Sequence, residues 1–468
     1  MTYYGLGGAL ADVNERSFWL DRDDAPTPAE PLSGQTRCDL AVVGAGYTGL
    51  WTALLAKEAD PSREVLVLES ATAGWAASGR NGGFCAASLT HGIDNGMSRF
   101  PDEMPVLERL GRENLDGIEA TVERFGIDCD FRRSGALDVA TEAHQVEWLR
   151  DDVETAKGFG HDAVFLDTDS VRAELNSPTY LAGAWHRDTT AMVDPAQLVW
   201  GLRAACLGLG VRIAERTPVS GLERSGAGVL LRCEGGAAVG AEKVALATNV
   251  FPALLRRVRP YVVPVYDYAL MTEPLSPEQV ATIGWEHRQG VGDVTNQFHY
   301  YRMTRDNRIL WGGYDAIYHW GSGLRAELDS RPGTFALLSR QFFGTFPQLR
   351  GLRFSHAWGG PIDTSSRFFA FQRTAMDGRV AYSTGYTGLG VGASRFGAQV
   401  MLDLMDGRRT EATSLRAVRG RPLPFPPEPL RYLGIQLTRR ALAKADRRQG
   451  HRGPWLRTLD RVGLGFDS

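Results

Sequence analysis

A glycine-rich turn between two short apolar segments carries the clearest chemical signal in the sequence. A mostly apolar segment runs directly into a G-x-G-x-x-G pattern formed by Gly44, Gly46 and Gly49. Glu69 stands twenty residues after Gly49, at the end of a second apolar run, 65–68. This spacing predicts a βαβ unit that binds an ADP-ribose group, because the glycines admit a pyrophosphate to a helix N-terminus and the acid accepts hydrogen bonds from ribose hydroxyls.

The composition is that of an ordinary soluble globular protein. A chain of 468 residues is too long for one small core and predicts two domains. The formal net charge of −3 gives no general attraction to nucleic acid, so no such partner is expected. The five cysteines are scattered without paired or metal-binding spacing, which predicts a reduced, cytoplasmic protein without a metal site. Neither a signal peptide nor a membrane span is expected, since no apolar segment is long enough.

Periodicity predicts the elements that would position these residues. The segment 243–249 predicts a buried strand that ends in small polar residues. Residues 380–383 predict another strand, which enters the glycine-rich segment 384–390 and then a helix. Aromatic residues alternate with others over 261–318, as they do in a sheet. Residues 1–36 are expected to form an N-terminal arm that rests on the body through Phe18 and Trp19.

Several separated motifs together resemble the FAD-dependent D-amino acid oxidase and glycine oxidase superfamily. They are GAGYTGL at 44–50, GWAASGRNGG at 74–83, ALATN at 245–249, WGGP at 358–361 and GYTGLGV at 385–391. Within this superfamily the chain is most similar to the gamma-glutamylputrescine oxidase-like branch.

The resemblance implies an α/β fold of the GR2 type. A Rossmann-like FAD-binding domain would be assembled from 37–95, 185–255 and 353–406. An α+β substrate-binding domain on an antiparallel sheet would comprise 96–184 and 256–352. Residues 407–468 would form a basic helical tail.

The resemblance also implies roles for the matched residues. The ADP half of FAD would be held by Gly44, Gly46, Gly49 and Glu69, with Val219 near the adenine. Tyr47, Thr48, Ser70 and Gly74 would also contact the cofactor. The pyrophosphate and flavin ring would contact Ser78, Arg80, Asn81, Gly82 and Gly83. Further cofactor contacts are expected from Thr248, Asn249, Gly360, Gly385, Gly388, Leu389, Gly390 and Val391. Backbone N–H groups of 388–390, at a helix N-terminus, would stabilise the negative charge of the reduced flavin pyrimidine.

Two absences bear on the cofactor. Relatives that bind FAD covalently carry a cysteine near the start of the last FAD segment, but none occurs between Arg353 and Phe371, so non-covalent FAD is expected. Relatives similar to sarcosine oxidase place a lysine over the flavin for the reaction with oxygen, but none occurs between Lys243 and Lys444. We expect O2 as the oxidant, with H2O2 as its product, and a dehydrogenase with another acceptor as the alternative.

The expected activity is oxidation of a C–N bond by hydride transfer to flavin N5, followed by hydrolysis of the imine to an aldehyde or ketone. Relatives that oxidise α-amino acids have an arginine close after the equivalent of Trp358, where this chain first has Arg367. This difference favours a primary or secondary amine over a simple α-amino acid. Asp363 would either pair with a cationic substrate group or hold a turn.

The catalytic candidates come mainly from the aromatic segment. They are Tyr301, Trp311, Trp358, His299 and Arg302, with Tyr266 and Tyr268 as further aromatic neighbours of the flavin. His91, like His299, would accept a proton or be structural. Arg302 would clamp a substrate carboxylate, or it would be an exposed strand arginine. The aromatic side chains would form an apolar pocket that attracts a cation, unless they belong to the core.

Two other classes of function remain open. A flavin-dependent monooxygenase or NAD(P)H-using oxidoreductase would share the first motif, although no second G-x-G-x-x-G follows a strand. A non-catalytic flavin-binding protein is the third possibility.

The expected partners are a small amine and O2, and the chain is expected to be a monomer or homodimer. The tail from residue 431 carries about +6 and the remainder about −9, so the tail either docks on the body or binds a membrane surface or partner.

Overall fold

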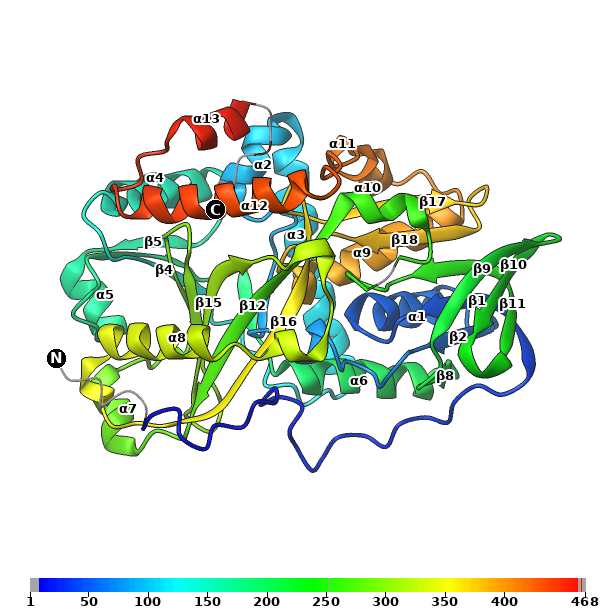
Figure 1. Ribbon diagram of the computed structural model, residues 1–468, viewed down its shortest axis with the longest axis horizontal. Coiled ribbons are helices and arrows are strands. Elements are labelled where there is room, and N and C mark those ends of the chain that lie inside the picture. The colour runs from blue at the N-terminus through cyan, green and yellow to red at the C-terminus, as the bar shows by residue number, and fades with distance from the viewer. Residues whose placement is uncertain (1–7, 252, 462–463, 465–468) are drawn as a thin grey trace.

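Two eight-stranded sheets lie side by side along the long axis of the molecule (Figure 1). The computed structural model describes residues 8–251, 253–461 and 464. The first sheet consists, in spatial order, of β17 (Phe371–Ala375), β18 (Val380–Thr384), β11 (Ala238–Leu246), β1 (Gln35–Val43), β2 (Val65–Leu68) and β8 (Arg212–Ala214). In addition, β10 (Gly228–Cys233) pairs with β11, and β9 (Val219–Ser225) pairs with β10.

The second sheet consists of β16 (Phe354–Ser365), β12 (Val262–Thr272), β15 (Ile309–Ile317), β14 (His299–Met303), β13 (Gly290–Asp293), β4 (Ala136–Ala140), β6 (Ala182–His186) and β5 (Ala163–Leu166). A small ribbon pairs β3 (Phe84–Ala86) with β7 (Thr190–Met192). The helices are α1 (Tyr47–Ala59), α2 (Ile93–Arg99), α3 (Met104–Arg124), α4 (Gln145–Gly158), α5 (Thr168–Glu174), α6 (Pro195–Gly208), α7 (Pro277–Ile283), α8 (Pro332–Thr345), α9 (Gly390–Met405), α10 (Glu411–Ser414), α11 (Arg416–Arg419), α12 (Leu430–Asp446) and α13 (Pro454–Arg461).

The first sheet is covered on both faces, which explains its continuous apolar strands. β1 pairs in parallel with β2 and β11, and β11 pairs in parallel with β18. Residues of α1, α6 and α9 pack on one face, while the β9–β10 hairpin packs on the other. Parallel strands buried on two faces need apolar residues at every position. The predicted βαβ unit is confirmed, because β1, the glycine turn, α1 and β2 follow one another as expected.

The second sheet has two different faces. β12 pairs antiparallel with β15 and β16, and α8 packs through Phe342 on the face that carries Trp311. The other face turns toward the first sheet. β13 and β4 run parallel, so the sheet is mixed rather than purely antiparallel. β16 belongs to this sheet, although its residues open the third segment that the sequence assigned to the FAD-binding domain.

Both ends of the described chain dock on the body. The Trp19 indole N–H donates to the carbonyl of Asn81 at 2.9 Å, and the Ser17 hydroxyl donates to the carbonyl of Gly79 at 2.9 Å. The arm therefore braces the segment 74–83, which we call the 74–83 loop. At the other end, α12 lies over the second sheet (Figure 1), where Arg439 pairs with Asp315 at 3.0 Å.

The docked α12 agrees with the first of the two alternatives for the basic tail. Residues 1–7 of the predicted arm, and 462–463 and 465–468 of the predicted tail, lie outside the described residues. Within the described part of the chain, no helix is long and apolar enough to cross a membrane.

Candidate active site

A cavity of about 1020 Å³ lies between the two sheets. Its walls come from the carboxyl ends of β1, β2 and β11, from the 74–83 loop, and from β12, β14 and β16. This volume lies at the upper end of the range for small-molecule sites, roughly 300–1,000 Å³, and suits a dinucleotide together with a small substrate. The end formed by the first sheet and the end formed by the second sheet have different chemistry.

Close backbone packing explains the glycines at the first end. Gly44 has a φ of +107°, and a side chain there would place Cβ 2.4 Å from the carbonyl oxygen of Ala247. A Cβ at Gly49 would lie only 1.8 Å from the carbonyl oxygen of Gly44. Gly46 is the N-cap of α1, and a Cβ there would approach the Ser78 Oγ at 2.9 Å. The glycines thus bring the N-terminus of α1 to the cavity wall without any side chain in between.

Two helix N-termini border the cavity. α1 and α9 both begin at residues that line it, and neither has an acidic residue in its first turn. The partial positive charge of these ends is therefore not neutralised by their own side chains. Such ends bind phosphate and other negatively charged groups. Their positions suit a pyrophosphate at α1 and a charged ring edge at α9.

Glu69 is fixed at the cavity wall by four donors. One carboxylate oxygen accepts from the Ala45 backbone N–H at 2.7 Å. The other accepts from the Ala71 backbone N–H, the Ser70 hydroxyl and the Trp75 indole N–H, each at 2.9 Å. The side chain is only 5% exposed. Its place at the end of β2 is the position from which an acid meets the ribose of a bound dinucleotide.

The 74–83 loop joins the two sheets. Asn81 holds its shape, since its side chain donates to the carbonyl of Ala77 at 2.9 Å and accepts from the Gly83 N–H at 2.8 Å. Arg80 donates to the carbonyl of Gly359 at 3.3 Å and forms an ion pair with Asp329. The Trp358 indole N–H donates back to the carbonyl of Arg80 at 2.8 Å. The loop is therefore anchored to β16 of the second sheet.

Most of the expected cofactor contacts line the cavity. These are Gly44, Gly46, Tyr47, Thr48, Glu69, Ser70, Gly74, Ser78, Arg80, Asn81, Gly82, Val219, Thr248, Asn249, Gly360, Gly388, Leu389, Gly390 and Val391. Gly49, Gly83 and Gly385 do not line it. They shape its walls instead: a Cβ at Gly83 would lie 2.2 Å from the carbonyl oxygen of Val193, and the Gly385 N–H donates to Asp363 at 2.6 Å.

The second end of the cavity is aromatic and carries the carboxylate of Asp267. Its wall includes Asp267, Phe298, Tyr300, Trp358 and Ile362. The Tyr300 hydroxyl donates to Asp267 Oδ2 at 2.5 Å, and the backbone N–H of Tyr268 donates to Oδ1 at 2.8 Å. Burial raises the pKa of Asp267 from 3.8 to about 7, because removal of water disfavours the charged form.

Two glycines make room for the Tyr300 ring. A Cβ at Gly312 would lie 2.1 Å from the ring, and one at Gly82 would lie 2.7 Å from it. Gly82 belongs to the 74–83 loop, so Tyr300 stands directly against the segment that the resemblance places at the flavin ring. The Tyr300–Asp267 pair is thus at the junction of the cofactor and substrate ends.

Three of the catalytic candidates lie on the opposite face of the second sheet. Tyr301 packs on Trp311 with ring centroids 4.5 Å apart, and its hydroxyl bonds that of Tyr180. His299 stacks on Trp311 at 4.9 Å and bonds Asp293 at 2.6 Å. None of the three lines the cavity. Successive residues of a strand point to opposite faces, so Tyr300 takes the cavity position that we had expected for Tyr301.

Arg302 shares the face of Tyr300 but lies behind the cavity wall. Its guanidinium donates to the carbonyl of Val193 at 2.5 Å, approaches Asp130 at 3.7 Å and lies over the Trp19 ring. Burial lowers its pKa to about 10. It does not line the cavity, so the structure gives it a bracing position instead of the expected carboxylate clamp.

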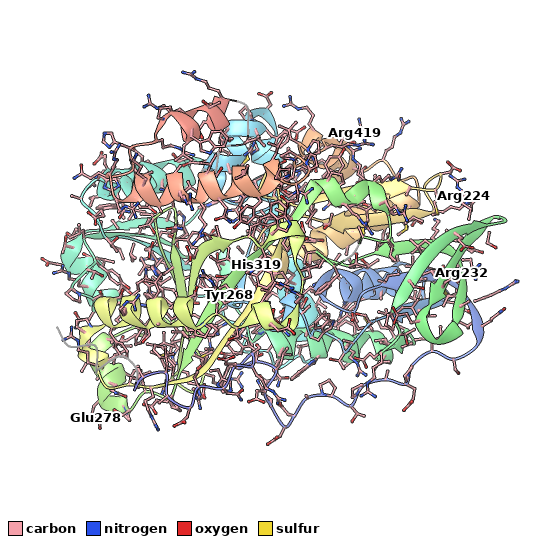
Figure 2. All side chains as sticks on the ribbon, viewed as in Figure 1. Arg224, Arg232, Tyr268, Glu278, His319 and Arg419 are labelled. Atoms are coloured by element: carbon pink, nitrogen blue, oxygen red, sulfur yellow. The ribbon has the colours of Figure 1, made fainter. Side chains whose placement is uncertain are left out.

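The remaining candidates divide between wall and core. Trp358, Tyr268 and His91 line the cavity, and burial lowers the pKa of His91. Figure 2 shows Tyr268 near the middle of the molecule, where its hydroxyl donates to the carbonyl of Leu328 at 2.8 Å. Tyr266 belongs to the core beneath α8.

Asp363 holds the turn that precedes α9. It accepts from the Gly385 N–H at 2.6 Å and from the Thr384 hydroxyl at 3.2 Å. Burial raises its pKa to about 6, although these hydrogen bonds act in the opposite direction. Its hydrogen bonds fit the turn alternative, and the residue also lines the cavity.

Comparison with known proteins identifies the family. A family model described as FAD dependent oxidoreductase matches residues 39–404. The chain belongs to this family. It is 31% identical to the gamma-glutamylputrescine oxidoreductase of Escherichia coli over 84% of this chain and 89% of that protein. It is 27% identical to a probable oxidoreductase, OrdL, of Haemophilus influenzae, over 84% of this chain and 88% of that protein.

Solved structures show the same fold. A glycine oxidase of Geobacillus kaustophilus superposes with a TM-score of 0.67 at 22% identity, over 80% of this chain and 96% of that one. An L-proline dehydrogenase of P. horikoshii superposes with a TM-score of 0.65 at 17% identity, over 82% of this chain and 96% of that one. The expected fold class and the resemblance to this superfamily are confirmed.

The donor set of the cavity fits the family's cofactor. FAD needs an acid at a ribose, N–H groups at a pyrophosphate and a positive environment at the pyrimidine edge. The cavity offers Glu69, the N-terminus of α1 and the N-terminus of α9 in these places.

Asp267 and Tyr300 are the residues of the site that the sequence did not single out. Asp267 is the one charged residue in the otherwise apolar and aromatic run of β12, and that signal was available.

Proposed function

We propose that this FAD-dependent oxidoreductase oxidises the C–N bond of a primary or secondary amine. The supporting observation is the chemistry of the second end of the cavity. There the wall supplies aromatic rings and the Asp267 carboxylate, whereas Arg302 lies behind the wall and Arg80 already pairs with Asp329 and a backbone carbonyl. An α-amino acid would need a cationic clamp for its carboxylate.

The first end of the cavity would hold FAD without a covalent bond. The N-terminus of α1 would bind the pyrophosphate, Glu69 the ribose, and the backbone around Val219 the adenine. The backbone of 388–390 would face the pyrimidine edge. No cysteine lines the cavity within the described part of the chain, which supports non-covalent attachment. When bound, FAD supplies the two-electron acceptor for a hydride from the carbon next to the substrate nitrogen.

The protein's own part is to hold the amine and exclude water. Phe298, Tyr300 and Trp358 give the substrate end rigid apolar walls that align the reacting carbon. The imine that the substrate becomes is then hydrolysed by water to an aldehyde or ketone, with release of ammonia or an amine. We take O2 as the final electron acceptor. It receives the two electrons and two protons and leaves as H2O2.

The test is anaerobic bleaching of the flavin absorbance in the purified holoenzyme. The panel contains butylamine, putrescine, γ-glutamylputrescine, sarcosine and glycine, with NADPH in a separate cell; γ-glutamylputrescine is included because of the name of the Escherichia coli relative. Bleaching by one of the amines supports the proposal. Bleaching by NADPH alone would favour a monooxygenase or reductase, and the absence of any bleaching would favour a non-catalytic flavin protein.

A further inference from the structure

Asp267 is a carboxylate in the cavity that lacks a cationic partner. Its two oxygens accept one hydrogen bond each from Tyr300 and Tyr268, and among the described residues it forms no ion pair with an arginine, lysine or histidine. Asp363, which also lacks a cation, accepts from the Gly385 N–H and the Thr384 hydroxyl and so holds the turn before α9. Glu215 pairs with Arg203 at 2.8 Å, and Glu69 has four donors. A desolvated carboxylate without a partner is costly to keep, so its retention calls for a ligand.

The space beside Asp267 is open. Asp267 of β12 stands directly opposite Gly360 of β16, and side chains of opposite residues share one face of an antiparallel pair. A Cβ at Gly360 would meet only the Cδ of Arg80, at 3.6 Å. Trp358 and Tyr300 flank the same space. The missing side chain at Gly360 thus leaves a small recess between a carboxylate and two aromatic rings, a combination suited to an ammonium group.

The cationic residues of the cavity are remote from this recess or already engaged. Arg80 pairs with Asp329. Arg256 and Arg259 also line the cavity, but they precede β12, which begins at Val262. Five residues of strand separate Val262 from Asp267, a span of roughly 17 Å at about 3.3 Å per residue. A carboxylate on the reacting carbon would therefore meet Asp267 beside an Arg80 that already pairs with Asp329, and like charges repel strongly in such a site.

We propose that Asp267 binds the substrate's reacting ammonium group, and that the substrate class is therefore amines without a carboxylate on the reacting carbon. This inference rests on the proposed function and adds the class of amine that the site accepts. An aliphatic ammonium has a pKa near that of lysine, about 10.4, so the substrate arrives as a cation. Transfer of one proton from its nitrogen to an Asp267 oxygen breaks an N–H bond and forms an O–H bond. It leaves the neutral amine, whose lone pair is needed when the adjacent carbon loses a hydride.

The raised pKa of Asp267 supports this assignment and fixes its pH dependence. With a pKa of about 7, the carboxylate of the free cavity is mostly protonated at pH 6 and mostly ionised at pH 8. Only the ionised form pairs with a cation. Binding of an amine should therefore strengthen about tenfold from pH 6 to pH 8 and change little above that. Asp293 and His299 lie on the far face of the sheet, and His91 lines another part of the wall, where burial lowers its pKa.

The experiment compares Asp267→Asn with Asp293→Asn, a matched change of a carboxylate on the far face of the same sheet. Butylamine and norvaline are the probes, because norvaline is butylamine with a carboxylate on the reacting carbon; the fastest amine of the panel is a third. In anaerobic titrations of the holoenzymes, Asp267→Asn should raise the amine concentration for half-maximal bleaching about 30-fold or more and remove the dependence on pH. The absorbance of the bound flavin should be unchanged, and Asp293→Asn should stay within about threefold of wild type.

Two results would overturn the inference while leaving the proposed function intact. One is an Asp267→Asn enzyme that is bleached by amines at wild-type concentrations with the wild-type pH dependence. The other is bleaching by norvaline as efficient as bleaching by butylamine. If no amine bleaches the wild-type flavin at all, the proposed function itself fails, so the two failures are distinguishable.

Discussion

The substitution Gly49→Ala tests the packing that brings α1 to the cofactor. The new Cβ would lie 1.8 Å from the Gly44 carbonyl oxygen, so α1 and the turn must separate by about 1.6 Å to reach an ordinary contact of 3.4 Å. α1 is buried between β1 and its helical neighbours, and overpacking of this kind costs ~1–3 kcal/mol or more. We expect the free energy of unfolding of the apoprotein to fall by about 3 kcal/mol.

The same displacement should weaken FAD binding. It moves the helix N-terminus away from the pyrophosphate, and a lost hydrogen bond to a charged group costs about 1.5–3 kcal/mol, or roughly a 10- to 150-fold rise in Kd. Urea unfolding of the apoprotein measures the first effect, and quenching of FAD fluorescence measures the second.

Gly46→Ala is the matched comparison. Its Cβ would meet only the Ser78 Oγ, at 2.9 Å, and that side chain can rotate. The apoprotein should therefore keep its stability to within about 1 kcal/mol, while FAD binding falls because the methyl group occupies the approach of the pyrophosphate. Gly434→Ala, in α12 with nothing within 4 Å, serves as the neutral control. The reasoning would be refuted if Gly46→Ala destabilised the apoprotein as much as Gly49→Ala while both bound FAD like wild type.

Three further predictions follow from the second sheet and the cysteines. Tyr300→Phe should lower kcat/KM for the best amine about tenfold, since it removes a hydrogen bond to Asp267. Tyr301→Phe should leave kcat/KM unchanged and lower only the free energy of unfolding, by about 1 kcal/mol. Equal losses of kcat/KM would contradict the assignment of the two tyrosines to opposite faces of the sheet. Because burial raises the pKa of Asp267 from 3.8 to about 7, the native chain holds a proton that the unfolded chain has lost, so this residue makes stability fall as pH rises from about 4 to 7. The free energy of unfolding of Asp267→Asn minus that of wild type should therefore be ~2–4 kcal/mol larger at pH 8 than at pH 5, as measured by urea unfolding of the apoproteins. An equal difference at both pH values would count against the raised pKa of Asp267. Acid precipitation should release all the yellow colour into the supernatant, and colour retained in the pellet would show covalent FAD.

The parts of the fold with strong local signals could be predicted from the sequence. The strand expected at 380–383 is β18, and the glycine pattern with Glu69 located β1, α1 and β2. These signals are local because a tight turn or a buried parallel strand restricts the residue type at each position.

The faces of the second sheet could not be predicted in the same way. Tyr300, Tyr301 and Arg302 are consecutive, and side chains alternate between the two faces of a strand. The sequence therefore allows either Tyr300 and Arg302, or Tyr301, to face the cavity. The choice depends on α8, which covers the face of Tyr301 and lies thirty residues further along the chain. Arg302 further depends on the arm, since Trp19 fills the space beside it. Contacts between segments this far apart in sequence leave no periodic signal.

The central claim is that the cavity removes two electrons from the C–N bond of an amine. A single anaerobic turnover tests it directly: the holoenzyme is mixed with the amine that bleaches fastest, and the carbonyl product is trapped and counted against the flavin reduced. The account predicts one aldehyde or ketone for each flavin bleached. Bleaching without a carbonyl product, or bleaching by NADPH and by none of the amines, would contradict it.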